Sequence, residues 1–133
     1  MDMTVKVLVV DDNNISREVI SELLVKQGWL VTTAKNGLQG LHFCNHQQFD
    51  AVVTGFYMPL LDGPHFVKIL KRNPQFADIP VAMLSTRTEQ EVMTHFEQNE
   101  LALFIRKPLN NATKQQFLDK LTALIVASEH KAA

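Results

Sequence analysis

The chain has 133 residues, of which 46% are hydrophobic and 20% charged, so it has the size and composition of a single globular domain, spanning residues 1–133. Thirteen Lys and Arg against fourteen Asp and Glu give a net charge of -1, which argues against direct nucleic-acid or membrane binding. The single cysteine, Cys44, excludes an internal disulfide, and neither a membrane span nor a secretory signal is recognisable, so we expect a cytoplasmic protein.

Short apolar runs alternate along the chain with amphipathic stretches. The first run, Val5–Val10, is rich in β-branched residues and ends in polar ones, which is typical of a strand buried on both faces. Apolar residues at helical spacing follow, with Asn13 or Asn14 as cap and Gly28 as stop. The later predicted elements are strand Trp29–Ala34, helix Gly37–Asn45, strand Ala51–Thr54, helix Gly63–Arg72, strand Ile79–Leu84, helix Glu89–Gln98, strand Leu101–Ile105 and a last helix after Asn110.

This alternation of strands and helices predicts a parallel sheet with helices on both faces. In such sheets the functional residues lie beyond the carboxyl ends of the strands. A carboxylate pair, hydroxyls and an ammonium group are expected there, which together suit a hard cation and an oxyanion. The residues concerned are Asp11, Asp12, Thr54, Gly55, Ser85, Thr86 and Lys107.

Several motifs at these strand ends are similar to those of one family. They are VLVVDDN at 7–13, Asn36-Gly37, MPLLDG at 58–63, Ile79-Pro80-Val81 and FIRKP at 104–108. Over essentially its whole length the chain resembles the receiver domains of bacterial two-component response regulators. The resemblance implies a phosphorelay signalling domain that is not an enzyme, with a flavodoxin-like (βα)5 fold: a three-layer α/β sandwich whose five-stranded parallel sheet has the order 2-1-3-4-5.

The end of the third predicted strand departs from the family's pattern. There the family has an aspartate, three residues before Met-Pro, that accepts a phosphoryl group from a histidine kinase. This chain has Gly55 at that position, and glycine offers no carboxylate nucleophile. Thr54 is expected to point to the opposite face, and Asp50 lies at the far end of the strand. We therefore predict an atypical receiver that acts by phosphorylation-independent protein contacts.

The resemblance also implies a Mg²⁺ site and a pair of switching side chains. The ligands would be Asp11, Asp12 and the backbone carbonyl of Tyr57, and without a third carboxylate we expect Mg²⁺ to bind weakly or not at all and no cofactor to be required. Ser85 and Phe104 occupy the positions at which the family has a hydroxyl and an aromatic ring that change rotamer on phosphorylation. Read without the family, the Asp11-Asp12 pair fits a helix N-terminus equally well, and Phe104 fits an ordinary core residue.

A partner surface is implied over the fourth helix, the fifth strand and the fifth helix. The expected partner is a protein, namely a histidine kinase, a phosphotransfer protein or an effector, and homodimer formation stays open. The candidate contact residues are Val92, His95, Phe96, Phe104 and Arg106.

Two alternative functions and one alternative metal site are compatible with parts of the sequence. The chain could be a true phosphoacceptor that uses Asp12, or a flavin or nucleotide binder, although the acidic loop after the first strand would repel a phosphate. A metal site on His42, Cys44 and His46 is disfavoured because only the two histidines share a helix face.

Overall fold

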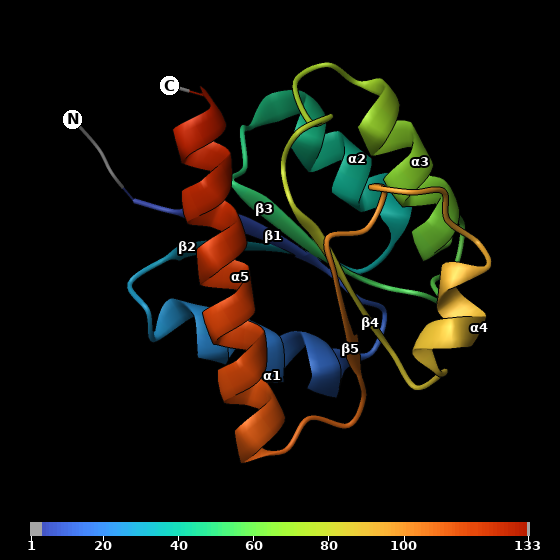
Figure 1. Ribbon diagram of the computed structural model, residues 1–133. Helices are drawn as coiled ribbons and strands as arrows, with labels where there is room; N and C mark the ends of the chain where they lie inside the picture. Colours follow the sequence, from blue (N-terminus) through green and yellow to red (C-terminus); the bar gives the residue numbers. More distant parts are fainter. Residues whose placement is uncertain (1–3, 133) are drawn as a thin grey trace.

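The computed structural model describes residues 4–132 and shows a three-layer α/β sandwich (Figure 1). Its five parallel strands form one sheet in the order β2-β1-β3-β4-β5, which confirms the predicted flavodoxin-like class and strand order. No helix in the described range combines the length and the apolar character needed to cross a membrane. The elements are β1 Lys6–Val10, α1 Asn14–Val25, β2 Leu30–Ala34, α2 Gly37–His46, β3 Ala51–Gly55, α3 Gly63–Arg72, β4 Val81–Ser85, α4 Glu89–Met93, β5 Leu103–Arg106 and α5 Asn111–Ala132.

The sheet separates two apolar cores. On β1, Leu8 and Val10 point into the core under α2, α3 and α4, whereas Val7 and Val9 point into the core under α1 and α5. Figure 1 shows the same division, with α1 and α5 on one side of the sheet and the other helices opposite. Burial on both faces explains why this strand is an almost continuous apolar run rather than an alternating one.

Capping side chains start the helices directly behind the carboxyl edge of the sheet. Each cap accepts a hydrogen bond from the backbone N–H three residues further on, which satisfies a donor that the helix itself leaves unpaired. Three of the caps follow their strands by two or three residues, whereas the cap of α3 comes seven residues after the end of β3. The caps of this kind are Asn13, Asn36, Asp62 and Thr88.

The fourth helix is shorter than predicted. The pattern indicated a helix over Glu89–Gln98, but α4 ends at Met93. The chain then leaves the helical path and reaches a φ of 72° at Asn99. Just beyond, the Glu100 carboxylate lies 2.9 Å from the ammonium of Lys68 on α3. The segment that follows α4 is therefore linked to α3 by an ion pair.

The bounds of the strands agree more closely with the prediction. The largest differences are in β4 and β5, which begin two residues later than the expected ranges Ile79–Leu84 and Leu101–Ile105. Both strands extend one residue further at their carboxyl ends, so they still deliver Ser85 and Lys107 to the expected edge.

Candidate functional site

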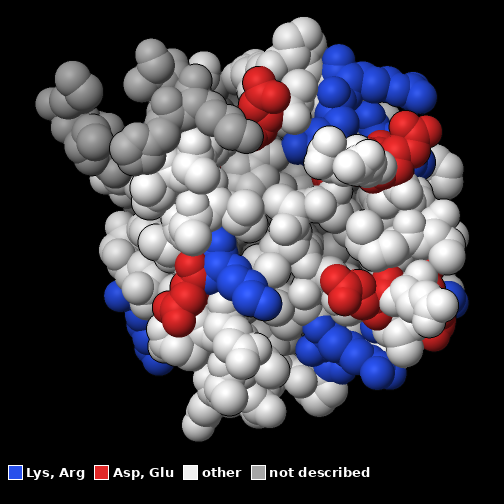
Figure 2. Space-filling model, in the orientation of Figure 1, with Lys and Arg blue, Asp and Glu red and all other residues white. Residues whose placement is uncertain are grey.

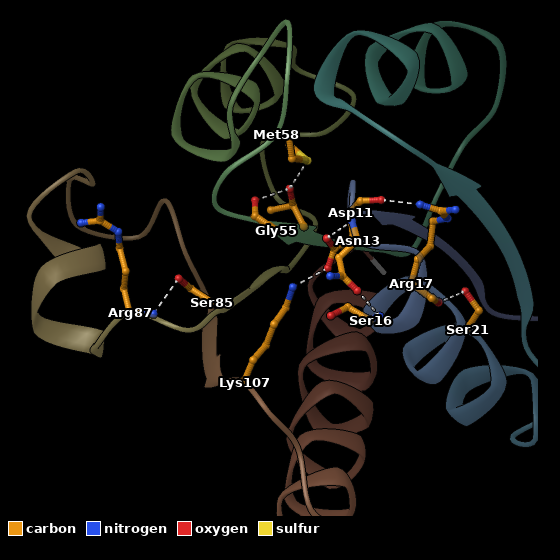
Figure 3. Close-up of polar contacts among 11 residues, drawn as sticks. Asp11, Asn13, Ser16, Arg17, Ser21, Gly55, Met58, Ser85, Arg87 and Lys107 are labelled. Carbon is orange, nitrogen blue, oxygen red and sulfur yellow. Dashed lines mark hydrogen bonds and ion pairs between the residues drawn. The ribbon is translucent and has the colours of Figure 1, made fainter.

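The carboxyl edge of the sheet brings Asp11 and Lys107 into direct contact (Figure 3). The Lys107 ammonium lies 2.7 Å from one carboxylate oxygen of Asp11, and the side chains are only 17% and 3% exposed. The backbone N–H of Asn13 donates to the other carboxylate oxygen at 3.0 Å. Both oxygens of this buried carboxylate are thus satisfied by groups of the protein itself, as a buried charge requires.

Gly55 faces the same carboxylate. A Cβ built on Gly55 would lie 3.3 Å from both Cγ and one oxygen of Asp11, so any side chain at this position would point into the site. The start of α3 packs tightly behind it, because the N–H of Gly63 donates to the Phe56 carbonyl and a Cβ on Gly63 would collide with the Gly55 carbonyl oxygen. The glycine at position 63 is therefore required by close packing.

Three other polar side chains lie on or directly before β3 or next to the site and are the alternatives to a residue at position 55 as a phosphoryl acceptor. Thr54 is fully buried, and its hydroxyl donates to the Gly55 carbonyl at 3.0 Å and approaches the sulfur of Met58, so it is not directed at Asp11. Asp50 accepts from the N–H of Lys6 at the amino edge of the sheet. Asp12 is at the site but exposed, and no described residue forms a hydrogen bond or an ion pair with its carboxylate.

The site does not fit a magnesium ion well. Mg²⁺ requires nearly ideal octahedral oxygen geometry, usually built on one or two carboxylates that are free to coordinate. Here the Asp11 carboxylate is occupied by Lys107 and the Asn13 amide, and Asp12 alone remains free. Within residues 4–132 no group of three or more His, Cys, Asp or Glu side chains is placed to hold a metal ion.

The histidine pair on α2 also lacks a third ligand. The rings of His42 and His46 have centroids 4.4 Å apart, and one ring nitrogen of His46 is already hydrogen-bonded to the His42 carbonyl. Cys44 is buried in the core, and this burial raises the pKa of its thiol to about 12. A protonated, buried thiol is a poor metal ligand.

The two proposed switch residues differ in their contacts. The hydroxyl of Ser85 accepts a hydrogen bond from the backbone N–H of Arg87 at 3.1 Å, and the Ser85 carbonyl accepts from the N–H of Lys107 at 2.8 Å. Phe104 is half-buried and packs against the core on the α3 side of the sheet. Ser85 is 5% exposed, so its hydroxyl lies beneath the surface of the site.

The predicted partner contacts are unevenly exposed. Val92 is fully buried in the core, so it cannot touch a partner, and its inclusion in the contact surface was wrong. His95 and Arg106 are exposed, whereas Phe96 and Phe104 are half-buried against the core. The inward orientation of Val92 follows from the single turn of α4, whose only buried residue anchors it to the sheet.

Sequence analysis did not identify the contacts of Arg87. Its guanidinium carbon lies 4.8 Å from the ring centroid of Tyr57 and 5.5 Å from that of Phe56, and its side chain donates a hydrogen bond to the Tyr57 hydroxyl. The sequence does contain a signal for this contact. Phe56 and Tyr57 follow β3 and Arg87 follows β4, the neighbouring strand, and arginine often stacks on aromatic rings. The side chain joins the loop that begins directly after Gly55 to the loop that follows β4.

Figure 2 shows how the charged side chains are distributed over one face of the molecule. On this face, acidic and basic side chains lie next to one another, and no large area of a single sign is present. The face drawn there therefore provides no extended field for a polyanion.

Comparison with known proteins settles the family. The model of the response regulator receiver domain matches residues 7–119. The chain belongs to this family. The receiver is 30% identical over 122 residues to the chemotaxis protein CheY-3 of Vibrio cholerae, covering 91% of this chain and 94% of that protein. The structure of CheY4 of Vibrio cholerae superposes with a TM-score of 0.82 at 29% identity, over 90% of this chain and 99% of that one.

Receiver domains also occur inside larger proteins. Hybrid signal transduction histidine kinase D of Dictyostelium discoideum is 31% identical over 105 residues, which is 79% of this receiver but only 7% of that protein. Receiver domains are modules of two-component signalling that interact with histidine kinases, effectors or other proteins, and they typically bind Mg²⁺ in their active site.

Proposed function

We propose that this receiver signals through contacts with a protein partner and does not accept a phosphoryl group. The observation that carries the proposal is the position of Gly55, where a side chain would point directly at Asp11 but none exists. In the family that this chain resembles, the same position holds the acceptor aspartate. The receiver scaffold is thus retained while its reacting group is missing.

The chemistry of phosphoryl transfer supports this reading. An aspartyl phosphate forms when a carboxylate oxygen bonds to phosphorus while the bond from phosphorus to the donor's imidazole nitrogen breaks. The nucleophile must lie in line with that leaving nitrogen. Asp11 is held by Lys107 and the Asn13 amide, and no described residue fixes the Asp12 carboxylate by a hydrogen bond or ion pair, so neither replaces the missing carboxylate.

The same proposal makes Mg²⁺ dispensable. In this site the Lys107 ammonium balances the charge of the buried Asp11 carboxylate. One free carboxylate, on Asp12, and the Tyr57 carbonyl form a weak ligand set for a small ion that is reluctant to lose water. We therefore assign no required cofactor to this chain, which we treat as one cytoplasmic receiver domain over residues 1–133.

The partner surface of the proposal is the one around α4, β5 and α5. Its members are the exposed His95 and Arg106 with the half-buried Phe96 and Phe104. Aromatic residues and arginine are the side chains that most often dominate protein interfaces. The partner would be a histidine kinase, a phosphotransfer protein or an effector.

Intact mass after incubation with acetyl phosphate and MgCl₂ tests the proposal. We expect no added phosphoryl mass on the native chain and a clear gain on Gly55→Asp, with Gly55→Asn as the matched variant that lacks a nucleophile. A gain on the native chain would overturn the proposal. Its loss in Asp12→Asn would then identify Asp12 as the acceptor.

A further inference from the structure

The side chain of Arg87 links the loop between β4 and α4 to the loop between β3 and α3. We define the Arg87 bridge as the contacts of Arg87 with Ser85, Tyr57 and Phe56. We infer that this bridge holds the β4–α4 loop in a single arrangement, so that the adjoining partner surface is presented independently of any phosphoryl group. The inference rests on the proposed function and names the regulation of the same site.

The backbone of Arg87 engages Ser85. Its N–H donates to the Ser85 hydroxyl at 3.1 Å, as Figure 3 shows, so this hydroxyl is oriented by its own loop. On the other side, Arg106 of β5 donates from Nε to the Thr86 carbonyl at 3.1 Å. The first residues after β4 are therefore tied to the sheet edge before α4 begins.

The side chain of Arg87 reaches a loop 30 residues earlier in the chain. It donates to the Tyr57 hydroxyl, and its guanidinium lies over the rings of Tyr57 and Phe56. A planar guanidinium can stack on an aromatic ring and donate hydrogen bonds at the same time, which lysine cannot do. Glu91, at 3.5 Å from the guanidinium, adds a longer contact from the first turn of α4.

The bridge continues into the proposed partner surface. The ring of Phe56 packs edge-on against the ring of His95, with centroids 5.0 Å apart. Phe56 is 6% exposed, so it forms a fixed base between the arginine and the histidine. Through Phe56, Arg87 thus also orders His95, an exposed residue of the partner surface. Such preorganisation lowers the entropic cost of binding.

Two readouts test the bridge directly. Tyr57 is the only tyrosine of the chain, so in protein labelled with ¹³C-tyrosine its ring gives a single unambiguous set of NMR signals. Hydrogen–deuterium exchange of the amides in 85–93 reports how often the β4–α4 loop opens. The variants are Arg87→Ala, Arg87→Lys and Arg72→Ala, the last as a control because Arg72 is exposed and forms no hydrogen bond or ion pair with the described residues.

For Arg87→Ala we expect a shifted Tyr57 ring signal and about tenfold faster exchange in 85–93, the size of effect typical of losing one stacked cation and one hydrogen bond. Arg87→Lys should give an intermediate acceleration, because it keeps the charge but not the planar stack. Arg72→Ala should match the native chain. Native exchange rates in Arg87→Ala, or an equal change in the control, would overturn the inference.

Acetyl phosphate and MgCl₂ added to the native chain separate this inference from the proposed function. We expect neither the Tyr57 signal nor the exchange of 85–93 to change. If the donor alters both and adds mass, the proposed function fails, and so does the claim that the partner surface is independent of a phosphoryl group; Arg87→Ala then decides only whether the bridge orders the loop. If the donor has no effect and Arg87→Ala is as ordered as the native chain, the bridge fails and the proposed function stands.

Discussion

Lys107 lies 2.7 Å from Asp11 although 96 residues separate them in the sequence. Their strands, β5 and β1, are not neighbours in the sheet, because β3 and β4 lie between them. Figure 3 shows the lysine side chain extending along the carboxyl edge toward Asp11. Gly55 leaves the centre of this edge free of any side chain, and the ion pair spans it.

Replacing Lys107 with methionine is expected to lower the free energy of unfolding by about 2 kcal/mol, because the buried Asp11 carboxylate would lose its counter-charge. Urea unfolding measures this. Lys114→Met is the matched control, since Lys114 is half-buried but its ammonium forms no ion pair with a described residue. Adding Asp11→Asn to Lys107→Met should recover part of the loss, and an equal loss in the control would refute the assignment.

Gly55→Asp is expected to couple the stability of the receiver to Mg²⁺. Without the ion, a carboxylate so close to that of Asp11 should cost about 1 kcal/mol. With millimolar Mg²⁺ the variant should gain stability by mass action, whereas the native chain should not respond. Thermal unfolding with and without MgCl₂ checks this, and Gly55→Asn separates the added charge from the added bulk. An equal Mg²⁺ response of the native chain would contradict the argument.

The ion pair between Glu100 and Lys68 should depend on pH. Burial alone would raise the pKa of Glu100, but the N–H of Glu97, the ammonium of Lys68 and the charge of Arg72 outweigh it and lower this pKa. The stabilisation is therefore complete above the ordinary pKa of 4.5 and disappears as the pH falls through the lower folded value. We expect less than about 1 kcal/mol, since Lys68 is partly exposed.

Glu100→Gln provides the test of this pH dependence. The difference in unfolding free energy between the native chain and the variant should be largest at pH 6 and should shrink toward pH 3. A difference that stays constant over this range would show that the Glu100 carboxylate does not titrate as argued.

Cys44 should be unreactive in the folded protein. Its side chain is 3% exposed, and burial raises the pKa of the thiol to about 12, so both access and thiolate formation are suppressed. A chromogenic disulfide reagent at pH 8 should label it at less than about one-thousandth of the rate seen in urea, because labelling then requires opening of the core. Comparable rates with and without urea would contradict the burial of this residue.

Local patterns in the sequence were sufficient for most of the fold. The helix Gly63–Arg72 was predicted with its observed bounds, since a proline near its start and an Asn-Pro after its end act on neighbouring residues. The sheet order came from the family resemblance, and the gathering of Asp11, Gly55, Ser85 and Lys107 at one edge follows from parallel strands. The absence of a side chain at position 55 is likewise visible in the sequence alone.

Only the tertiary structure decided which of these groups touch. The pairing of Lys107 with Asp11 and the stacking of Arg87 on Tyr57 join residues that are far apart in the chain. A helical pattern over Glu89–Gln98 likewise does not reveal that Glu100, just beyond it, pairs with Lys68 of α3. The periodicity of apolar residues predicts which side of a helix or strand is buried. It does not predict which residue of another element a side chain contacts, because that depends on how the elements pack together.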